Sequence, residues 1–202
     1  MTLAFAVLGD SIAYGQGASR PADTIGARLA ADLTRSGHVV DLRVVAVPGA
    51  DSRGLAGQVA TATAPNLALV IIGANDLTHL VPPRQAGTLL GGAVRDLRAA
   101  GAEVVVAPAP DLSVVPWVPP QMRMLVSAGS RAVQQEQVRA ATAAGARIAD
   151  IGGTTSVAFA ADPALFSADR FHPSSAGYAV IADALAATVR DAAIAAAQRV
   201  SR

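Results

Sequence analysis

The stretch TLAFAVLGDS, residues 2–11, passes without interruption from an apolar run to a glycine, an aspartate and a serine. A short apolar run that is bounded by turn residues is typical of a buried strand. We therefore predict a strand over Leu3–Leu8 that ends by presenting Gly9, Asp10 and Ser11 at its carboxyl end. The chemistry available at that strand end then depends on what the rest of the chain brings there.

Similar apolar runs alternate with longer helical patterns along the whole chain. Further strands are expected at Val39–Val47, Leu67–Ile72, Glu103–Ala107 and Arg147–Ile151, several of them rich in valine and isoleucine. Helices are expected at Asp23–Ser36, Ser52–Thr61, Gln85–Ala100, Pro120–Ala144 and Ser174–Arg199. Three of these helices are followed by glycines that suit a helix C-terminus, namely Gly37, Gly101 and Gly145.

This alternation predicts an α/β fold, a three-layer sandwich in which helices cover both faces of a five-stranded parallel sheet. The run LALVII, residues 67–72, is apolar on both of its faces, as burial under two helical layers requires. A chain of 202 residues suits one well-buried core, so residues 1–202 are expected to form a single domain. The proline-rich stretch Pro108–Pro120 is expected to be a loop beside the functional site.

The composition excludes several classes of partner. The formal net charge is +1, and the basic residues, all arginine, form no basic cluster, so nucleic-acid binding is not expected. No segment reaches the roughly 18 apolar residues of a membrane span, because Asp183, Arg190 and Asp191 interrupt the most apolar long stretch. Cysteine is absent, which excludes disulfides and thiolate metal sites. The first residues do not resemble a secretory signal, so a cytoplasmic location is expected, although a chain trimmed of an export signal would look the same.

Polar clusters follow several of the predicted strands or precede the last helix. In open parallel α/β sheets, ligands bind outside the carboxyl ends of the strands, so residues far apart in sequence are expected to meet in one pocket. The clusters are Gly9-Asp10-Ser11, Pro48-Gly49-Ala50, Gly73-Ala74-Asn75-Asp76 and Asp169-Arg170-Phe171-His172-Pro173.

These clusters contain the parts that a serine nucleophile requires. A hydroxyl needs a base to take its proton, and a histidine base needs a carboxylate that fixes its tautomer. Ser11, His172 and Asp169 supply those three groups. The N–H groups of Ser11 and Gly49 and the side-chain amide of Asn75 are candidate donors to a developing oxyanion.

The combination of motifs resembles the SGNH (GDSL) hydrolase family of esterases and lipases. The resemblance covers the whole chain in order, from GDS through a glycine after the second strand and GxND after the third to DxxH before the last helix. It implies a flavodoxin-like fold, Ser11 as nucleophile, Asp169 and His172 as orienting acid and base, and Gly49 and Asn75 as oxyanion donors. It also implies that no metal or organic cofactor is needed.

Several of these residues have alternative interpretations. Asp162 is a rival to Asp169 as the partner of His172. Asp10 and Asp76 are interpreted as structural, each bracing its own loop. His79, near the GAND loop, is a candidate to line the site, but a solvated loop position is the preferred interpretation.

The expected function is hydrolysis of small carboxylic esters with short- to medium-chain acyl groups. Aromatic residues make up only 3% of the chain, which disfavours a stacking platform for sugars. Trp117, in the proline-rich loop, is expected either to flank an acyl chain or simply to pack on the sheet edge. The alternatives are a thioesterase or an acyltransferase on the same site, or a non-catalytic flavodoxin-like binding module. The sequence leaves the oligomeric state open.

Overall fold

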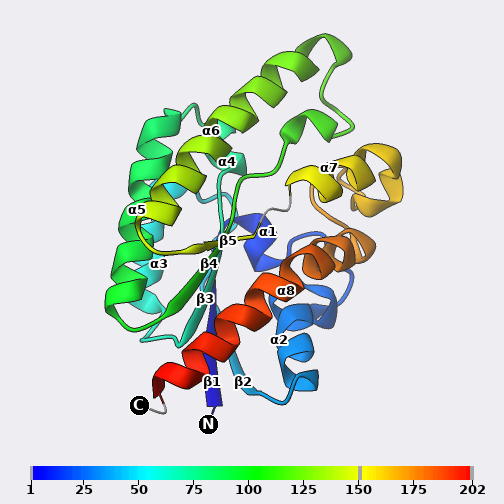
Figure 1. Cartoon of the computed structure of the whole chain (residues 1–202). Helices are drawn as coiled ribbons and strands as arrows, with labels where there is room; N and C mark the ends of the chain where they lie inside the picture. The colour runs from blue at the N-terminus through cyan, green and yellow to red at the C-terminus, as the bar shows by residue number, and fades with distance from the viewer. Residues whose placement is uncertain (1, 150–151, 201–202) are drawn as a thin grey trace.

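The computed structural model of the chain describes residues 2–149 and 152–200 (Figure 1). Five strands form one parallel sheet in the order β2-β1-β3-β4-β5. They are β1 (Thr2–Gly9), β2 (Val39–Val44), β3 (Leu67–Ile71), β4 (Glu103–Ala107) and β5 (Arg147–Ile148). The prediction of a parallel α/β sheet of five strands is therefore confirmed.

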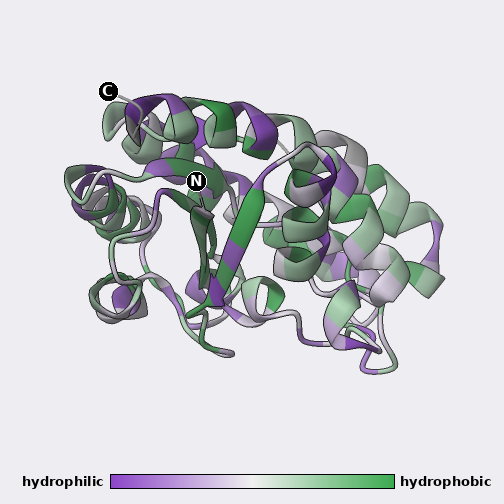
Figure 2. Ribbon diagram, turned by 90° about the horizontal axis from the view of Figure 1, so that it is seen from below, coloured by the Kyte–Doolittle hydropathy of each residue, from purple (hydrophilic) through white to green (hydrophobic). Residues whose placement is uncertain are grey.

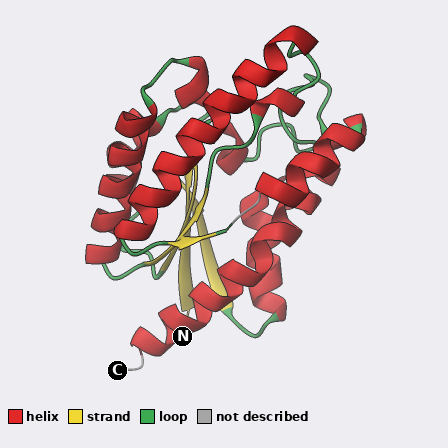
Figure 3. Cartoon of the chain, turned by 45° about the horizontal axis from the view of Figure 1, so that its top comes forward, coloured by secondary structure: helices red, strands yellow, loops and turns green. Residues whose placement is uncertain are grey.

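Helices connect the strands and cover the sheet on both sides, as Figure 3 shows. They are α1 (Ser11–Tyr14), α2 (Ile25–Arg35), α3 (Leu55–Thr61), α4 (Ala74–Thr78), α5 (Pro83–Ala99), α6 (Arg123–Ala143), α7 (Gly152–Ala161) and α8 (Ser175–Val200). Short 3-10 turns occupy Pro21–Asp23, Ser52–Gly54, Leu112–Val114, Pro120–Met122 and Pro163–Leu165. None of the described helices is long and apolar enough to cross a membrane.

Two apolar cores lie on opposite faces of the sheet, because side chains alternate between the faces along each strand. Leu3, Phe5 and Val7 of β1 face the core that contains α2 and α8, whereas Ala6 and Leu8 face the core that contains α3 and α5. The central strands β3 and β4 are therefore buried on both sides, whereas the edge strand β2 carries the exposed Asp41 and Arg43 on one face. In Figure 2 the sheet lies between the helical layers, and this double burial explains why the central strands lack a polar face.

Three helices were not expected, and β2, β3 and β5 end earlier than predicted. The short helices α1 and α4 occupy stretches expected to be turns, and α7 begins with Gly152 and Gly153, residues with low helix propensity. Tertiary packing compensates in α7, where Phe159 packs edge-on against Phe166 at a ring-centroid distance of 5.0 Å. Strand β2 ends at Val44 rather than Val47. The expected end of the last strand, Ile151, lies outside the described residues.

The strand order places β1 between β2 and β3, so the chain goes from β1 to β2 on one side and then crosses back to β3 on the other side. Such a switch point opens a crevice at the carboxyl ends of the strands. Ser11 follows β1 directly and therefore stands at this crevice.

Candidate active site

A sharp turn at the end of β1 exposes Ser11. Gly9 has φ +136°, and a Cβ at this position would lie 1.7 Å from the carbonyl oxygen of Ile71, so only glycine fits. The Asp10 side chain then accepts a hydrogen bond from the N–H of Ile12 at 2.9 Å and caps α1. Ser11 is consequently the first residue of α1, a position whose N–H has no acceptor within the helix.

Gln58, on α3, holds this turn from the other side. Its buried side-chain amide accepts from the N–H of Gly9 at 2.7 Å and donates to the carbonyl of Gly9 at 2.8 Å. The sequence analysis missed this residue. Nothing in the local pattern of α3 marks Gln58, because its partner lies 49 residues away and depends on how α3 docks on the sheet.

Ser11, His172 and Asp169 form a continuous series of contacts. Nε2 of His172 lies 3.0 Å from Oγ of Ser11, and Nδ1 of His172 lies 2.6 Å from Oδ2 of Asp169. The His172 ring thus bridges the hydroxyl and the carboxylate, as a base held by an orienting acid would. These are the three side chains that the sequence analysis selected.

Residues 167–172 form a turn that brings the carboxylate of Asp169 to the ring of His172, three residues later in the chain. Arg170 adopts φ +59°, which reverses the chain between the two residues. Oδ1 of Asp169 accepts from the N–H groups of Phe171 and His172 at 2.9 Å each and from the Ser167 hydroxyl at 2.8 Å. Partial burial raises the pKa of Asp169, but the hydrogen bonds from His172 and the backbone outweigh it and hold that pKa below its ordinary value.

The rival carboxylate, Asp162, has a different role. Its side chain accepts from the N–H of Ala164 at 2.9 Å and caps the 3-10 turn Pro163–Leu165. Among the described contacts, the His172 ring is paired with Asp169 rather than with Asp162.

The histidine loop packs closely against the loop that follows Ser11. A Cβ on Gly17 would lie 2.5 Å from the carbonyl oxygen of Pro173 and 3.0 Å from Cβ of His172. The hydroxyl of the buried Tyr178 donates to the carbonyl of Gln16 at 2.7 Å. These contacts fix the His172 loop relative to Ser11, although the two are 161 residues apart.

The candidate oxyanion donors come from neighbouring strand ends. Gly49 lies in the turn after β2 and has φ +80°, and Asn75 lies in α4. The side-chain amide of Asn75 donates to the carbonyl of Ala50 at 2.9 Å, which joins the two loops. A primary amide carries two N–H groups, so this contact leaves one available for another acceptor.

Two buried carboxyl groups, of Asp10 and Asp76, are next in sequence to Ser11 and Asn75. Asp76 accepts from the N–H and the hydroxyl of Ser52 at 3.1 and 2.8 Å, which agrees with the bracing role expected for it. Burial raises the pKa of Asp10 from its ordinary 3.8 to about 7, with a smaller contribution from the nearby Asp76. The backbone N–H groups of Ile12, Gly73 and Ala74 act in the opposite direction on this pKa, but burial outweighs them.

We predict that Asp10 makes stability depend on pH. Because its pKa is raised on folding from 3.8 to about 7, the folded state binds more protons between these values, and the free energy of unfolding falls as pH rises through this range. At about 1.4 kcal/mol per pKa unit, the total loss is of the order of a few kcal/mol. Asp10→Asn, which keeps an acceptor for Ile12, should lose less stability than the wild type in urea unfolding between pH 4 and pH 8. Identical pH slopes for the two proteins would contradict the prediction.

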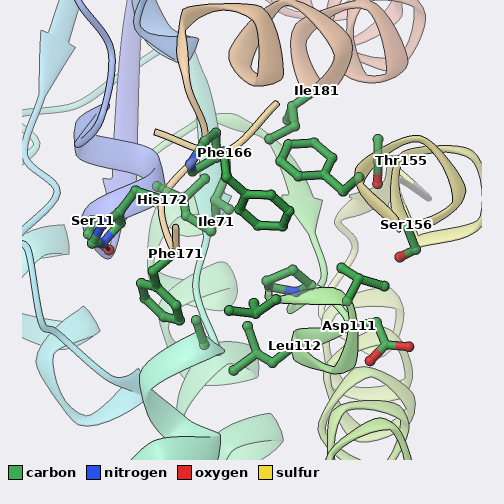
Figure 4. Close-up of a pocket in the computed structure, with 17 residues that line it drawn as sticks. Ser11, Ile71, Asp111, Leu112, Thr155, Ser156, Phe166, Phe171, His172 and Ile181 are labelled. Atoms are coloured by element: carbon green, nitrogen blue, oxygen red, sulfur yellow. Dashed lines mark hydrogen bonds between the residues drawn. The ribbon is translucent and has the colours of Figure 1, made fainter. Parts of the chain in front are cut away.

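An apolar cleft extends from Ser11 and His172 (Figure 4). It measures about 690 Å³ with the space open to solvent included. The proline-rich loop forms one wall, as expected, and α7 and α8 contribute others. The lining side chains include Leu112, Val114, Val115, Phe159, Phe166, Phe171 and Ile181.

Trp117 does not line this cleft directly. Its half-exposed ring stacks on Phe171 with the centroids 5.5 Å apart, and Phe171 in turn meets the His172 ring edge-on at 4.9 Å. Trp117 therefore packs on the histidine loop rather than on the sheet edge, and Phe171 forms the surface toward the cleft.

The chain is similar in sequence to known hydrolases. A sequence model described as the GDSL-like lipase/acylhydrolase family matches residues 7–180. A GDSL-like esterase from Mycobacterium tuberculosis is 37% identical over 192 residues, an alignment that covers 92% of this chain. The alignment spans only 61% of the length of that relative.

Solved structures share the fold. TesA superposes with a TM-score of 0.75 at 19% identity, covering 93% of this chain and 98% of TesA. A psychrotrophic esterase, EstA from Pseudoalteromonas sp., gives a TM-score of 0.70 at 18% identity and covers 93% of this chain and 97% of EstA. At these identities the likeness shows the architecture.

Proposed function

Because the chain belongs to the GDSL-like lipase/acylhydrolase family, we propose that it is a serine esterase that works through an acyl-Ser11 intermediate. The observation that carries this proposal is the unbroken series of contacts from the Ser11 hydroxyl through the His172 ring to the Asp169 carboxylate. A non-catalytic binding module would have no need for this series.

In the first half-reaction, Oγ of Ser11 attacks the ester carbonyl carbon while Nε2 of His172 takes the hydroxyl proton. Asp169 holds Nδ1 of the imidazole and stabilises the imidazolium. The negative charge on the carbonyl oxygen is received by the N–H groups of Ser11 and Gly49 and by the free N–H of Asn75. His172 then donates its proton to the alcohol oxygen as the bond to the acyl carbon breaks.

In the second half-reaction, His172 removes a proton from water, whose oxygen attacks the acyl-Ser11 carbonyl. The same donors receive the second oxyanion. Collapse of this intermediate returns the proton to Oγ of Ser11 and releases the carboxylic acid. No metal or organic cofactor takes part in these steps.

The apolar lining of the cleft indicates that the enzyme recognises its substrate through an apolar acyl group. Its walls are aliphatic and phenylalanine side chains that begin at Ser11 and His172, and burying each methylene group against such walls contributes about 0.8 kcal/mol. We therefore assign small esters of short- to medium-chain acids as substrates.

This assignment predicts a chain-length optimum. With p-nitrophenyl esters from acetate to palmitate, kcat/KM should rise and then fall as the acyl chain outgrows the cleft. Val114 lines the cleft and is only partly buried, so Val114→Phe should lower the ratio of octanoate to acetate activity about tenfold. Val157→Phe, at a 71% exposed position of α7, is the matched control and should keep the wild-type profile. An equal change of the octanoate-to-acetate ratio in both variants would show that the acyl group binds outside this cleft.

A further inference from the structure

The two loops that carry Gly49 and Asn75 are joined by a chain of side-chain contacts. Asn75 donates to the carbonyl of Ala50 at 2.9 Å. Asp76 binds the backbone and the hydroxyl of Ser52, as described above. Beyond these two contacts lies a third, in which Nδ1 of His79 meets Oδ2 of Asp51 at 2.9 Å. The consecutive residues 50–52 are therefore each tied to the segment 75–79.

The third contact differs from the other two in its position. Ser52 and Asp76 are almost fully buried. The His79 side chain is 45% exposed, whereas the Asp51 side chain is 8% exposed. The third contact between the two loops is therefore the one that lies nearest to solvent. Asp51 is also held by Arg53, whose hydrogen bonds keep the pKa of Asp51 well below its ordinary value and keep it ionised.

His79 is also linked to Asn75 through the backbone. The N–H of His79 donates to the carbonyl of Asn75 at 2.8 Å and ends α4, which is only five residues long. A displacement of His79 therefore shifts the backbone of Asn75 and, with it, the Asn75 side-chain amide. On the other side, Asp51 follows Gly49 by only two residues.

Oxyanion donors act only within narrow geometric limits. A donor must lie about 2.7–3.1 Å from the position of the oxyanion, and a misplacement of about 1 Å can cost two orders of magnitude in rate. Here the proposed donors sit on two separate loops, so their spacing depends on the contacts that join those loops.

We propose that His79 and Asp51 are positioning residues that set the spacing between the oxyanion donors Gly49 and Asn75. The inference rests on the proposed function and deepens it, since it gives a role to a histidine outside the Ser11–His172–Asp169 series. His79 takes no part in proton transfer in this role. It acts through Asn75, and Asp51 acts through Gly49.

The test is the steady-state kinetics of His79→Leu and His79→Asn with a p-nitrophenyl ester. His79→Leu should lower kcat about tenfold with KM nearly unchanged, because the donors stabilise the transition state more than the bound substrate. His79→Asn places an amide N–H near the position of Nδ1 and should restore most of kcat. A purely structural role would not produce this split between kcat and KM.

Arg190→Leu is the matched control. It removes a similarly exposed ion pair, from Arg190 to Asp32 at 2.9 Å, that joins α8 to α2 away from both donor loops. This variant should keep the wild-type kcat. An equal loss of kcat in Arg190→Leu and His79→Leu would attribute the effect to general destabilisation and overturn the proposal.

A double-mutant cycle tests the partnership itself. If His79 acts by its contact with Asp51, the effect of His79→Leu should largely vanish in an Asp51→Ala background, which lacks the acceptor, whereas independent residues would give additive losses. Additive losses would overturn the pairing. The proposed function fails separately, if Ser11→Ala keeps wild-type activity. If Ser11→Ala is inactive and His79→Leu keeps the wild-type kcat, only the positioning role of His79 and Asp51 is overturned.

Discussion

Ser11→Ala should lower kcat for ester hydrolysis by about 10⁴–10⁶-fold without loss of the fold. The variant removes the only hydroxyl that contacts Nε2 of His172 among the described residues. Ser11 is 5% exposed, and the change deletes one oxygen atom at the first position of a helix, where alanine is well tolerated. Any remaining activity would come from the donors and the cleft acting on water.

The measurement is kcat with a p-nitrophenyl ester, together with intact mass after treatment with a fluorophosphonate. Wild-type protein should gain one phosphonyl group on Ser11, and Ser11→Ala should gain none. Ser156→Ala is the control, because Ser156 lines the same cleft but has no described contact with His172. Equal rates in the wild type and Ser11→Ala would show that Ser11 is not the nucleophile.

Asp169→Asn should lower kcat by about 10⁴-fold. Oδ2 of Asp169 accepts from Nδ1 of His172 at 2.6 Å. An amide group in its place offers an N–H to that nitrogen and favours the wrong imidazole tautomer. The turn should survive, since the Asn carbonyl oxygen can still accept from the N–H groups of Phe171 and His172.

Asp162→Asn provides the matched comparison, because it makes the same chemical change in the same loop region. Its amide oxygen can keep the cap on Ala164, so kcat should stay within about twofold of the wild type. Thermal unfolding of both variants checks that each is folded. A loss of activity in Asp162→Asn that matches the loss in Asp169→Asn would reject Asp169 as the orienting acid.

Much of the architecture was predictable because it depends on local sequence patterns. Apolar runs such as residues 67–72 have the length and the composition of buried strands between two layers. The order of the GDS, GxND and DxxH motifs along the chain was sufficient to indicate the family, which the comparisons confirm.

Local patterns failed where tertiary packing supplied the stability. Helix α7 starts with two glycines and was not predicted, since its formation depends on Phe159 packing against Phe166. Gln58 and His79 looked like ordinary polar positions. Their roles follow from contacts with Gly9 and Asp51, which are 49 and 28 residues away in the sequence.

The sequence by itself determined the class of fold and the family, and it singled out the side chains to which the proposed function gives the reactive roles, because strand periodicity and short motifs depend only on neighbouring residues. The tertiary structure alone decided that Asp169 rather than Asp162 contacts His172, that Gln58 holds the Ser11 turn, and that Asp51 and His79 join the two donor loops. The contacts of Gln58 and His79, at 2.7 and 2.9 Å, join segments 49 and 28 residues apart in the chain, and the contact of Asp169 depends on the turn at Arg170. Such distances are set by strand order and by how the helices dock on the sheet, which no local stretch of sequence encodes.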